Sequence, residues 1–188
     1  MNIKQELVQY YQWLRQYGLN DSHSGNASVK DGDSFWITPT GACADTLTEN
    51  DLVKCKLDQP PSAGASLDAA LHRAVYLNNP DINAVLHSHG AHTVAMTMKG
   101  EAFVPFDFEG QYYFGQVPVV DLDYDHVLDH AIELVAEELK TSKVAVVCGH
   151  GVYAAGENLN MAYKWSCSLE LSAKTAFIAL QAGTYPKV

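Results

Sequence analysis

DINAVLHSHG, residues 81–90, is the stretch of this sequence that most clearly indicates an α/β fold. Its apolar run has the length of one buried strand and ends in His87 and His89, followed by Gly90. Side chains alternate between the two faces of a strand, so both imidazoles point to the same side. Two imidazoles so placed can bind one transition-metal ion, although the pair alone also fits a chance motif or hydrogen bonds in the core.

Helical and strand patterns alternate along the rest of the chain. They predict one α/β domain, 1–188, with helices on both sides of a central sheet. One expected helix is capped by Ser66 and runs through Tyr76. The other expected helices are 2–17, 92–98, 125–140 and 159–183. The expected strands are a hairpin within 24–41, 82–89, a stretch over 112–118 and two strands within 143–155.

The composition excludes several classes of protein. Of the 188 residues 47% are apolar and 18% are charged, so the chain can bury a sizeable core. A formal net charge of −10 argues against nucleic acid or an anionic membrane as a partner. No apolar run approaches the ~20 residues of a membrane span. With no secretory leader and no C-x-x-C pair among its four cysteines, the chain is expected to be cytoplasmic and free of disulfides.

A third histidine follows the next strongly apolar run. His150 lies between two glycines in VVCGHGVYAAG, residues 146–156, and these allow a sharp turn that exposes the side chain. A turn histidine without a partner is the alternative. Ligands of α/β sheets collect beyond strand ends, so His87, His89 and His150 together favour an open catalytic metal site. A closed structural zinc site would more often recruit cysteines.

Three other motifs partly resemble metal-binding or cofactor-binding sites. GHGVYA fits a variant of the dinucleotide fingerprint, but VYAA is strand-like and too few residues follow to complete such a fold. DLDYD, residues 121–125, opens like a calcium loop but lacks the later glycine and carboxylate. His126 and His130, spaced i, i+4 on a helix, fit an exposed polar face better than a metal site.

Asp68 lies near the start of a predicted helix. A carboxylate is favoured there by the helix dipole, and from the residue alone this explanation is as good as a catalytic one. His72 follows four residues later on the same helical face, where we expect it to make a structural hydrogen bond.

Four stretches, in this order and at this spacing, resemble the class II aldolase/adducin family over nearly the whole chain. They are SGNASV (24–29), ITPTG (37–41), SLDAALHRAVYLNNPDINAVLHSH (66–89) and GHGVYAAGENLNMAYKWSCSLE (149–170). The resemblance implies a single three-layer α/β domain whose central, mostly antiparallel sheet is flanked by helices. It also implies a homotetramer with active sites between subunits.

The enzymes of this family cleave, epimerise, dehydrate or decarboxylate sugar phosphates and sugar acids. The resemblance therefore implies a small sugar or sugar-phosphate substrate and one divalent metal ion per subunit, most commonly Zn²⁺, with Mn²⁺ or Co²⁺ as alternatives. Its ligands would be His87, His89 and His150, and Asp68 would be the acid/base. Aspartate at this position is found in the ribulose-phosphate 4-epimerases of the family, so it does not favour an aldolase over an epimerase.

The resemblance also assigns substrate-binding residues. The phosphate-binding segments correspond to Gly25 with Asn26, Thr40 with Gly41, and Ser66. The residue after Ser66 is Leu67, which removes one hydroxyl from the expected pocket and puts the phosphate in question. The proton donor from the neighbouring subunit would be Tyr113, preferred over Tyr112, with Tyr185 as a tail candidate.

These expectations combine into a metal-dependent aldolase that cleaves a small ketose phosphate or related sugar. A 4-epimerase, a dehydratase or a decarboxylase could use the same metal site. The alternative from another class is a non-catalytic, adducin-like binding domain. The adducin domain lacks the metal histidines, whereas this chain retains all three, which favours an enzyme.

Overall fold

A seven-stranded sheet forms the centre of the computed structural model, which describes residues 2–122 and 127–186. The strands are β1 (Asn26–Asp31), β2 (Ser34–Ile37), β3 (Val53–Lys56), β4 (Ala84–Ser88), β5 (Val119–Val120), β6 (Val144–Val147) and β7 (Gly151–Gly156). Their spatial order is β3-β2-β1-β4-β7-β6-β5, and every pair is antiparallel except β5 with β6. The predicted α/β domain with a mostly antiparallel sheet is confirmed.

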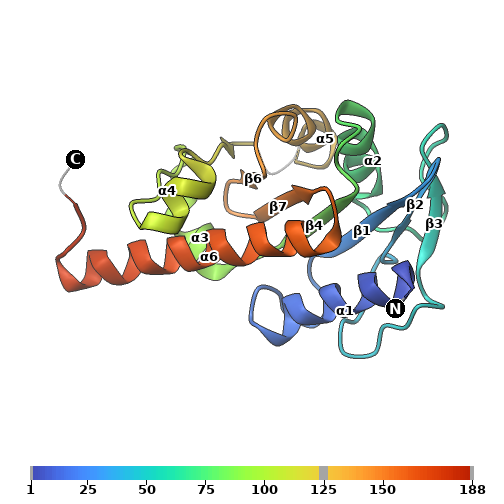
Figure 1. Ribbon diagram of the computed structural model, residues 1–188, viewed down its shortest axis with the longest axis horizontal. Helices are drawn as coiled ribbons and strands as arrows, with labels where there is room; N and C mark the ends of the chain where they lie inside the picture. Colours follow the sequence, from blue (N-terminus) through green and yellow to red (C-terminus); the bar gives the residue numbers. More distant parts are fainter. Residues whose placement is uncertain (1, 123–126, 187–188) are drawn as a thin grey trace.

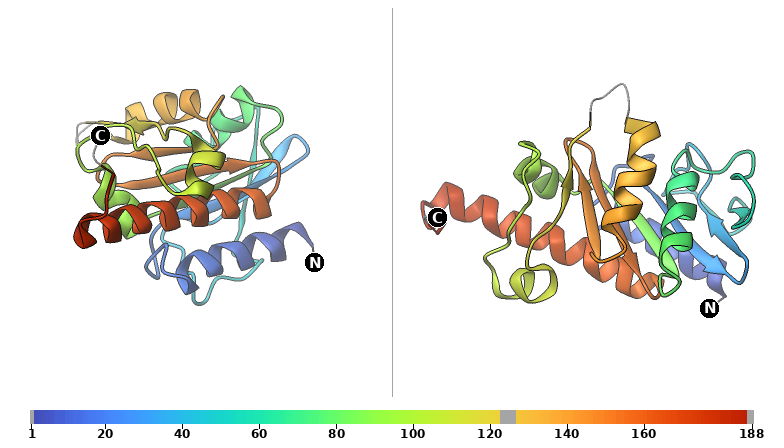
Figure 2. Two further views of the ribbon diagram at one scale, coloured as in Figure 1. Left: turned by 60° about the vertical axis from the view of Figure 1, so that its left-hand side comes forward. Right: turned by 90° about the horizontal axis from the view of Figure 1, so that it is seen from above.

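Helices cover both faces of this sheet. They are α1 (Ile3–Gln16), α2 (Ala69–Asn78), α3 (Ala91–Thr97), α4 (Phe108–Phe114), α5 (Val127–Glu138) and α6 (Leu159–Ala182). Figure 1 shows α2 and α5 on one side of the sheet and α1 and α6 on the other. The left view in Figure 2 shows the same layers, with α1 and α6 together below the strands and α2 and α5 above them. In the right view, seen from above, α2 and α5 lie in front of the strands.

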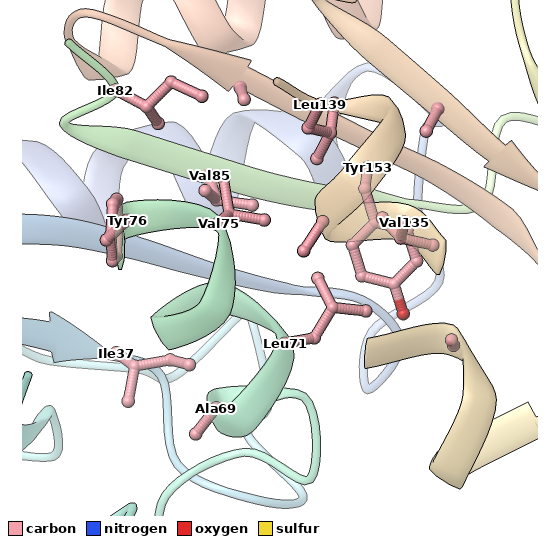
Figure 3. Packing of buried hydrophobic residues seen from close by; sticks show 14 of the residues in the cluster. Ile37, Ala69, Leu71, Val75, Tyr76, Ile82, Val85, Val135, Leu139 and Tyr153 are labelled. Atoms are coloured by element: carbon pink, nitrogen blue, oxygen red, sulfur yellow. The ribbon is translucent and has the colours of Figure 1, made fainter. Parts of the chain in front are cut away.

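The alternation of side chains along β4 explains how one strand serves both layers. Val85 packs in the cluster with α2 and α5, whereas Ala84 and Leu86 pack in the cluster with α1 and α6. Figure 3 shows Val85 with Leu71 and Val75 of α2. Each fully buried leucine or valine of this kind contributes about 1.5–3 kcal/mol to folding. His87 is two residues after Val85 and therefore faces the layer of α2 and α5.

The longest helices have the expected end signals. Asn2 accepts the Gln5 N–H at the start of α1, in a capping box, and Asn158 accepts the Met161 N–H at the start of α6. The chain leaves α6 at Gly183, whose φ of 69° is in the left-handed region that glycine adopts without strain. These signals explain why the predicted helix ends agree closely with the structure.

Two local predictions are wrong. Ser66 does not cap α2, which begins at Ala69 and has Asp68 at its N-cap position; the Ser66 N–H bonds instead to the carbonyl of Thr38. Part of the predicted strand over 112–118 belongs to α4. The Asp107 carboxylate accepts the Gly110 N–H and caps this helix, which overrides the strand preference of the aromatic residues that follow.

Candidate metal centre and active site

Three histidines from two strand ends meet at one point. The Nε2 atom of His87 lies 2.9 Å from Nε2 of His89 and 3.3 Å from Nε2 of His150. The candidate ligand atoms of the three residues all lie within 4.8 Å of one another. His87 and His89 come from the end of β4, and His150 comes from the turn between β6 and β7. The predicted convergence of the three imidazoles is therefore present in the fold.

Hydrogen bonds and burial prepare these rings to act as ligands. The Nδ1 atom of His87 lies 3.0 Å from the carbonyl oxygen of Val152, which assigns the proton to Nδ1 and leaves a lone pair on Nε2. Burial lowers the pKa of His87 to about 3 and that of His89 to about 4, so both are neutral near pH 7. Lone pairs this close repel one another unless a proton or a metal cation lies between them. The donor set fits a divalent ion such as zinc.

The backbone that carries His89 is held by the loop after α1. The His89 N–H donates to the carbonyl of Leu19 (2.8 Å) and to Oδ1 of Asn20 (2.9 Å). The Asn20 amide in turn donates to the carbonyl oxygen of His87 at 3.5 Å. The Gly25 backbone lies so close to this contact that a Cβ atom on Gly25 would overlap both the Asn20 amide and the His87 carbonyl oxygen. This loop therefore fixes the spacing of the first two histidines.

A carboxylate from α6 supports the other side of this segment. Glu170 accepts the N–H groups of His92 (3.0 Å) and Thr93 (2.9 Å) and the Thr93 hydroxyl (2.8 Å). It satisfies free N–H groups in the first turn of α3, which begins two residues after His89.

The histidines open into a cavity of about 240 Å³. Every proposed metal and phosphate residue and Asp68 line it, whereas the tyrosine candidates do not. The lining residues are His23, Gly25, Asn26, Pro39, Thr40, Gly41, Ala42, Ser66, Leu67, Asp68, His87, His89 and His150. Leu67 is 75% exposed, so a large apolar side chain occupies the place where the family resemblance led us to expect a hydroxyl.

Asp68 lies beside the histidines, with its Oδ2 atom 3.9 Å from Nε2 of His87. This oxygen accepts the Asn26 amide at 2.7 Å and the Tyr153 hydroxyl at 3.0 Å. Burial raises the pKa of the Asp68 carboxyl, but the imidazoles of His87 and His72 and the two donors outweigh it, so the pKa lies below its ordinary value. Asp68 is therefore a carboxylate near pH 7 and can accept a proton.

His72 has a structural environment, as expected. It is completely buried, and its Nδ1 atom lies 2.7 Å from the Ser28 hydroxyl, which also contacts the Tyr76 hydroxyl at 2.6 Å. Burial lowers the pKa of His72 to about 4, despite the opposing effect of Asp68. The neutral ring belongs to a buried polar cluster under the site.

The tyrosines lie elsewhere on the chain. The Tyr113 ring packs against Trp165, with 5.5 Å between ring centroids, and Lys164 lies over it at 4.3 Å. Tyr112 is 78% exposed, and Tyr185 packs against Phe106. A role for Tyr113 at the cavity therefore requires a neighbouring copy of the chain.

The motifs that we rejected have other places in the fold. GVYAAG forms β7, as its strand-like pattern predicted. His126 and three residues of DLDYD lie outside the described residues, and His130 is exposed on α5. The four cysteines are free thiols. None of the helices in the described ranges combines the length and apolar character needed to cross a bilayer.

Comparison with known proteins identifies the family. The model of the Class II Aldolase and Adducin N-terminal domain matches residues 5–177. The chain belongs to this family.

Its relatives in the family carry out more than one reaction. The structure of L-fuculose-1-phosphate aldolase from Thermus thermophilus superposes with a TM-score of 0.88 at 32% identity, over 97% of each chain. The L-fuculose phosphate aldolase of Methanocaldococcus jannaschii is 29% identical over 83% of this chain and 85% of that protein. An L-ribulose-5-phosphate 4-epimerase from Salmonella paratyphi C is 28% identical over 94% of this chain and 85% of its own.

Asn20 and Tyr153 belong to the site but could not be found from the sequence. Asn20 carries no motif, because its role depends on the loop folding back onto β4. Tyr153 lies three residues after His150, but only the register that places it opposite His87 gives it a partner.

Proposed function

We propose that this protein is a divalent-metal-dependent aldolase that cleaves a small ketose phosphate or a related sugar. The observation that carries the proposal is the position of Asp68, a carboxylate 3.9 Å from the His87 Nε2 atom in the cavity shared by all three histidines. A metal site next to a proton acceptor is the arrangement that carbon–carbon bond cleavage next to a carbonyl requires.

His87, His89 and His150 would hold the ion, for which we propose Zn²⁺ with Mn²⁺ or Co²⁺ as alternatives. When bound, it would polarise the substrate carbonyl and stabilise the negative charge that develops on the ketose fragment. Neutral imidazoles leave the ion its full charge, and three protein ligands leave a position open for substrate.

Asp68 would accept the proton from the hydroxyl on the carbon that becomes the aldehyde. The electrons of the O–H bond then form the new carbonyl as the carbon–carbon bond breaks. Tyr113 of a neighbouring copy would return a proton to the ketose fragment. Its ring is packed on its own α6, so only assembly could bring the hydroxyl to a cavity.

Residues that line the cavity together with the histidines would bind the substrate phosphate. They are Gly25, Asn26, Thr40, Gly41 and Ser66, whose backbone N–H groups and hydroxyls can bind an anion without a cationic side chain.

The second candidate function is a 4-epimerase. It is favoured by Asp68, because the family resemblance places aspartate at this position in the epimerases, and one relative carries that name. Recapture of the aldehyde after rotation would use the same metal and carboxylate. A dehydratase or decarboxylase on this site would also begin from a metal-polarised carbonyl.

We also propose a homotetramer with active sites between subunits. The exposed apolar side chains of α4 and α6 support it, among them Phe108, Tyr112, Leu171 and Ile178. Light scattering should give four times the chain mass, and Leu171→Glu with Ile178→Glu should give monomers that lack lyase activity. Monomeric wild-type protein with full activity would exclude a contribution of Tyr113 from another copy.

Product analysis over a panel of ketose phosphates tests the proposal and separates its alternatives. An aldolase releases a three-carbon phosphate or a two-carbon fragment together with an aldehyde. An epimerase returns a stereoisomer of equal mass, and a decarboxylase releases CO₂. Protein that contains no metal, converts none of these sugars and still folds normally would be a binding domain instead.

A further inference from the structure

Three side chains stand in a row across the centre of the sheet. In the ladder, His87 of β4 lies opposite Asn26 of β1 on one side and Tyr153 of β7 on the other. Cross-strand neighbours of this kind project from the same face of a sheet. The Tyr153 ring therefore stacks on the His87 imidazole, with 4.1 Å between centroids and 7° between planes.

The two flanking residues bind the same atom. Asn26 and Tyr153 both donate to Oδ2 of Asp68, at 2.7 and 3.0 Å, and this oxygen is also the one nearest to the His87 ring. The Oδ1 atom of Asp68 has no hydrogen bond to a described residue. The carboxylate of Asp68 is thus held by its Oδ2 atom, and its Oδ1 atom remains available to accept a proton.

Tyr153 itself has no room for a substrate beside it. It is 2% exposed, it packs in the core with α2 and α5, and it does not line the 240 Å³ cavity. The cavity that it does line, with Asp68 and His150, has a volume of only about 10 Å³. Figure 3 shows its ring within the cluster beside Val135. Any effect of its hydroxyl on the reaction must therefore pass through Asp68.

We propose that Tyr153 is a positioning residue that, with Asn26, holds Oδ2 of Asp68 beside the histidines and leaves Oδ1 as the proton-accepting oxygen. This inference rests on the proposed function. The Tyr153 ring stacks on His87, so the position of the Tyr153 hydroxyl is set by the same histidine that would bind the metal. The acid/base and the metal site thus share one rigid support.

Tyr153→Phe tests the proposal, since it removes the hydroxyl and keeps the ring. The matched control is Tyr76→Phe, which removes another buried tyrosine hydroxyl that bonds to Ser28 and does not contact Asp68. Loss of a hydrogen bond to a charged group should lower kcat of Tyr153→Phe by about tenfold or more. KM and the metal content should stay close to wild type, and Tyr76→Phe should keep wild-type kcat. Equal kcat values in the two variants would overturn the proposal.

A double-mutant cycle shows whether Tyr153 acts through Asp68. In an Asp68→Asn background, Tyr153→Phe should change kcat by less than about twofold, because residues that act as a unit are not additive. A full additional loss would show a separate role for the hydroxyl and contradict the inference.

A third readout needs no turnover. In protein with ¹³C-labelled aspartate carboxyls, the Asp68 resonance, identified by its loss in Asp68→Asn, should move in Tyr153→Phe and stay in place in Tyr76→Phe. An unmoved resonance would overturn the inference. Failure of the proposed function is distinct: there, wild-type protein itself would convert none of the sugars in the panel.

Discussion

The Oδ2 atom of Asp68 lies 3.9 Å from Nε2 of His87, although the two residues come from different layers of the fold. Asp68 immediately precedes α2, which packs on the face of the sheet to which His87 points. The proposed proton acceptor and the proposed metal ligand are therefore adjacent because a helix start and a strand end meet.

Asp68→Asn should retain metal and lose turnover. The amide keeps the shape of the side chain but cannot take a proton, so kcat should fall by about 10²–10⁴-fold. Steady-state kinetics and metal analysis of the same preparation measure both quantities. Unchanged turnover would mean that Asp68 serves only the start of the helix.

Gly25→Ala should weaken metal binding strongly. A Cβ at this position would collide with the Asn20 amide and the His87 carbonyl, in addition to the strain of a φ of 67°. Displacing groups that orient ligands typically costs about 10–100-fold in metal affinity. The matched control is Gly32→Ala, which has a similar φ of 63° but open space around the Cβ. Equal zinc affinity of the two variants, from competition with a chelator, would exclude a role for this contact.

Leu67→Ser should increase the preference for phosphorylated substrates. Leu67 lines the cavity next to Ser66, and a hydroxyl there could donate to a phosphate oxygen. A hydrogen bond to a charged group of this kind should lower KM for a sugar phosphate by about tenfold. Leu67→Ala controls for loss of the bulky side chain. If both variants lower KM equally, steric relief explains the change and the hydroxyl does not.

His72 should make the stability of the protein depend on pH. Its pKa is lowered by burial to about 4, from 6.5, so the folded state favours the neutral ring. The neutral His72 ring therefore contributes about 3 kcal/mol to the free energy of unfolding. This contribution is complete above about pH 6.5 and is lost as the pH falls towards 4.

His72→Asn keeps a polar atom near the Ser28 hydroxyl and removes this titration. Urea unfolding of chelator-treated protein at pH 7 and pH 4 should show a smaller pH dependence in the variant. The same difference in unfolding free energy for both proteins would show that folding does not lower the pKa of His72.

The convergence of the three histidines could be predicted because its signal is local. Strand alternation places His87 and His89 on one face, and the glycines around His150 mark a turn at a second strand end. The pair Tyr153 and Asp68 could not be predicted in this way, since it depends on the register of β7 against β4 and on how α2 packs on them.

The region of α4 was mispredicted for a related reason. The aromatic residues Tyr112, Tyr113 and Phe114 have a high strand propensity, whereas the capping contact of Asp107 with Gly110 favours a helix. Packing of Tyr113 and Phe114 against Trp165 adds a tertiary contact that the local pattern does not contain.

The metal content of protein purified without added metal, compared between wild type and His89→Ala, tests the central claim most directly. His92→Ala is the control, since its ring bonds to Glu170 and not to the other histidines. We expect about one zinc-like ion per wild-type and control chain, and almost none in a folded His89→Ala protein. Wild-type protein that neither contains nor binds a divalent ion, or His89→Ala that retains one per chain, would contradict the account.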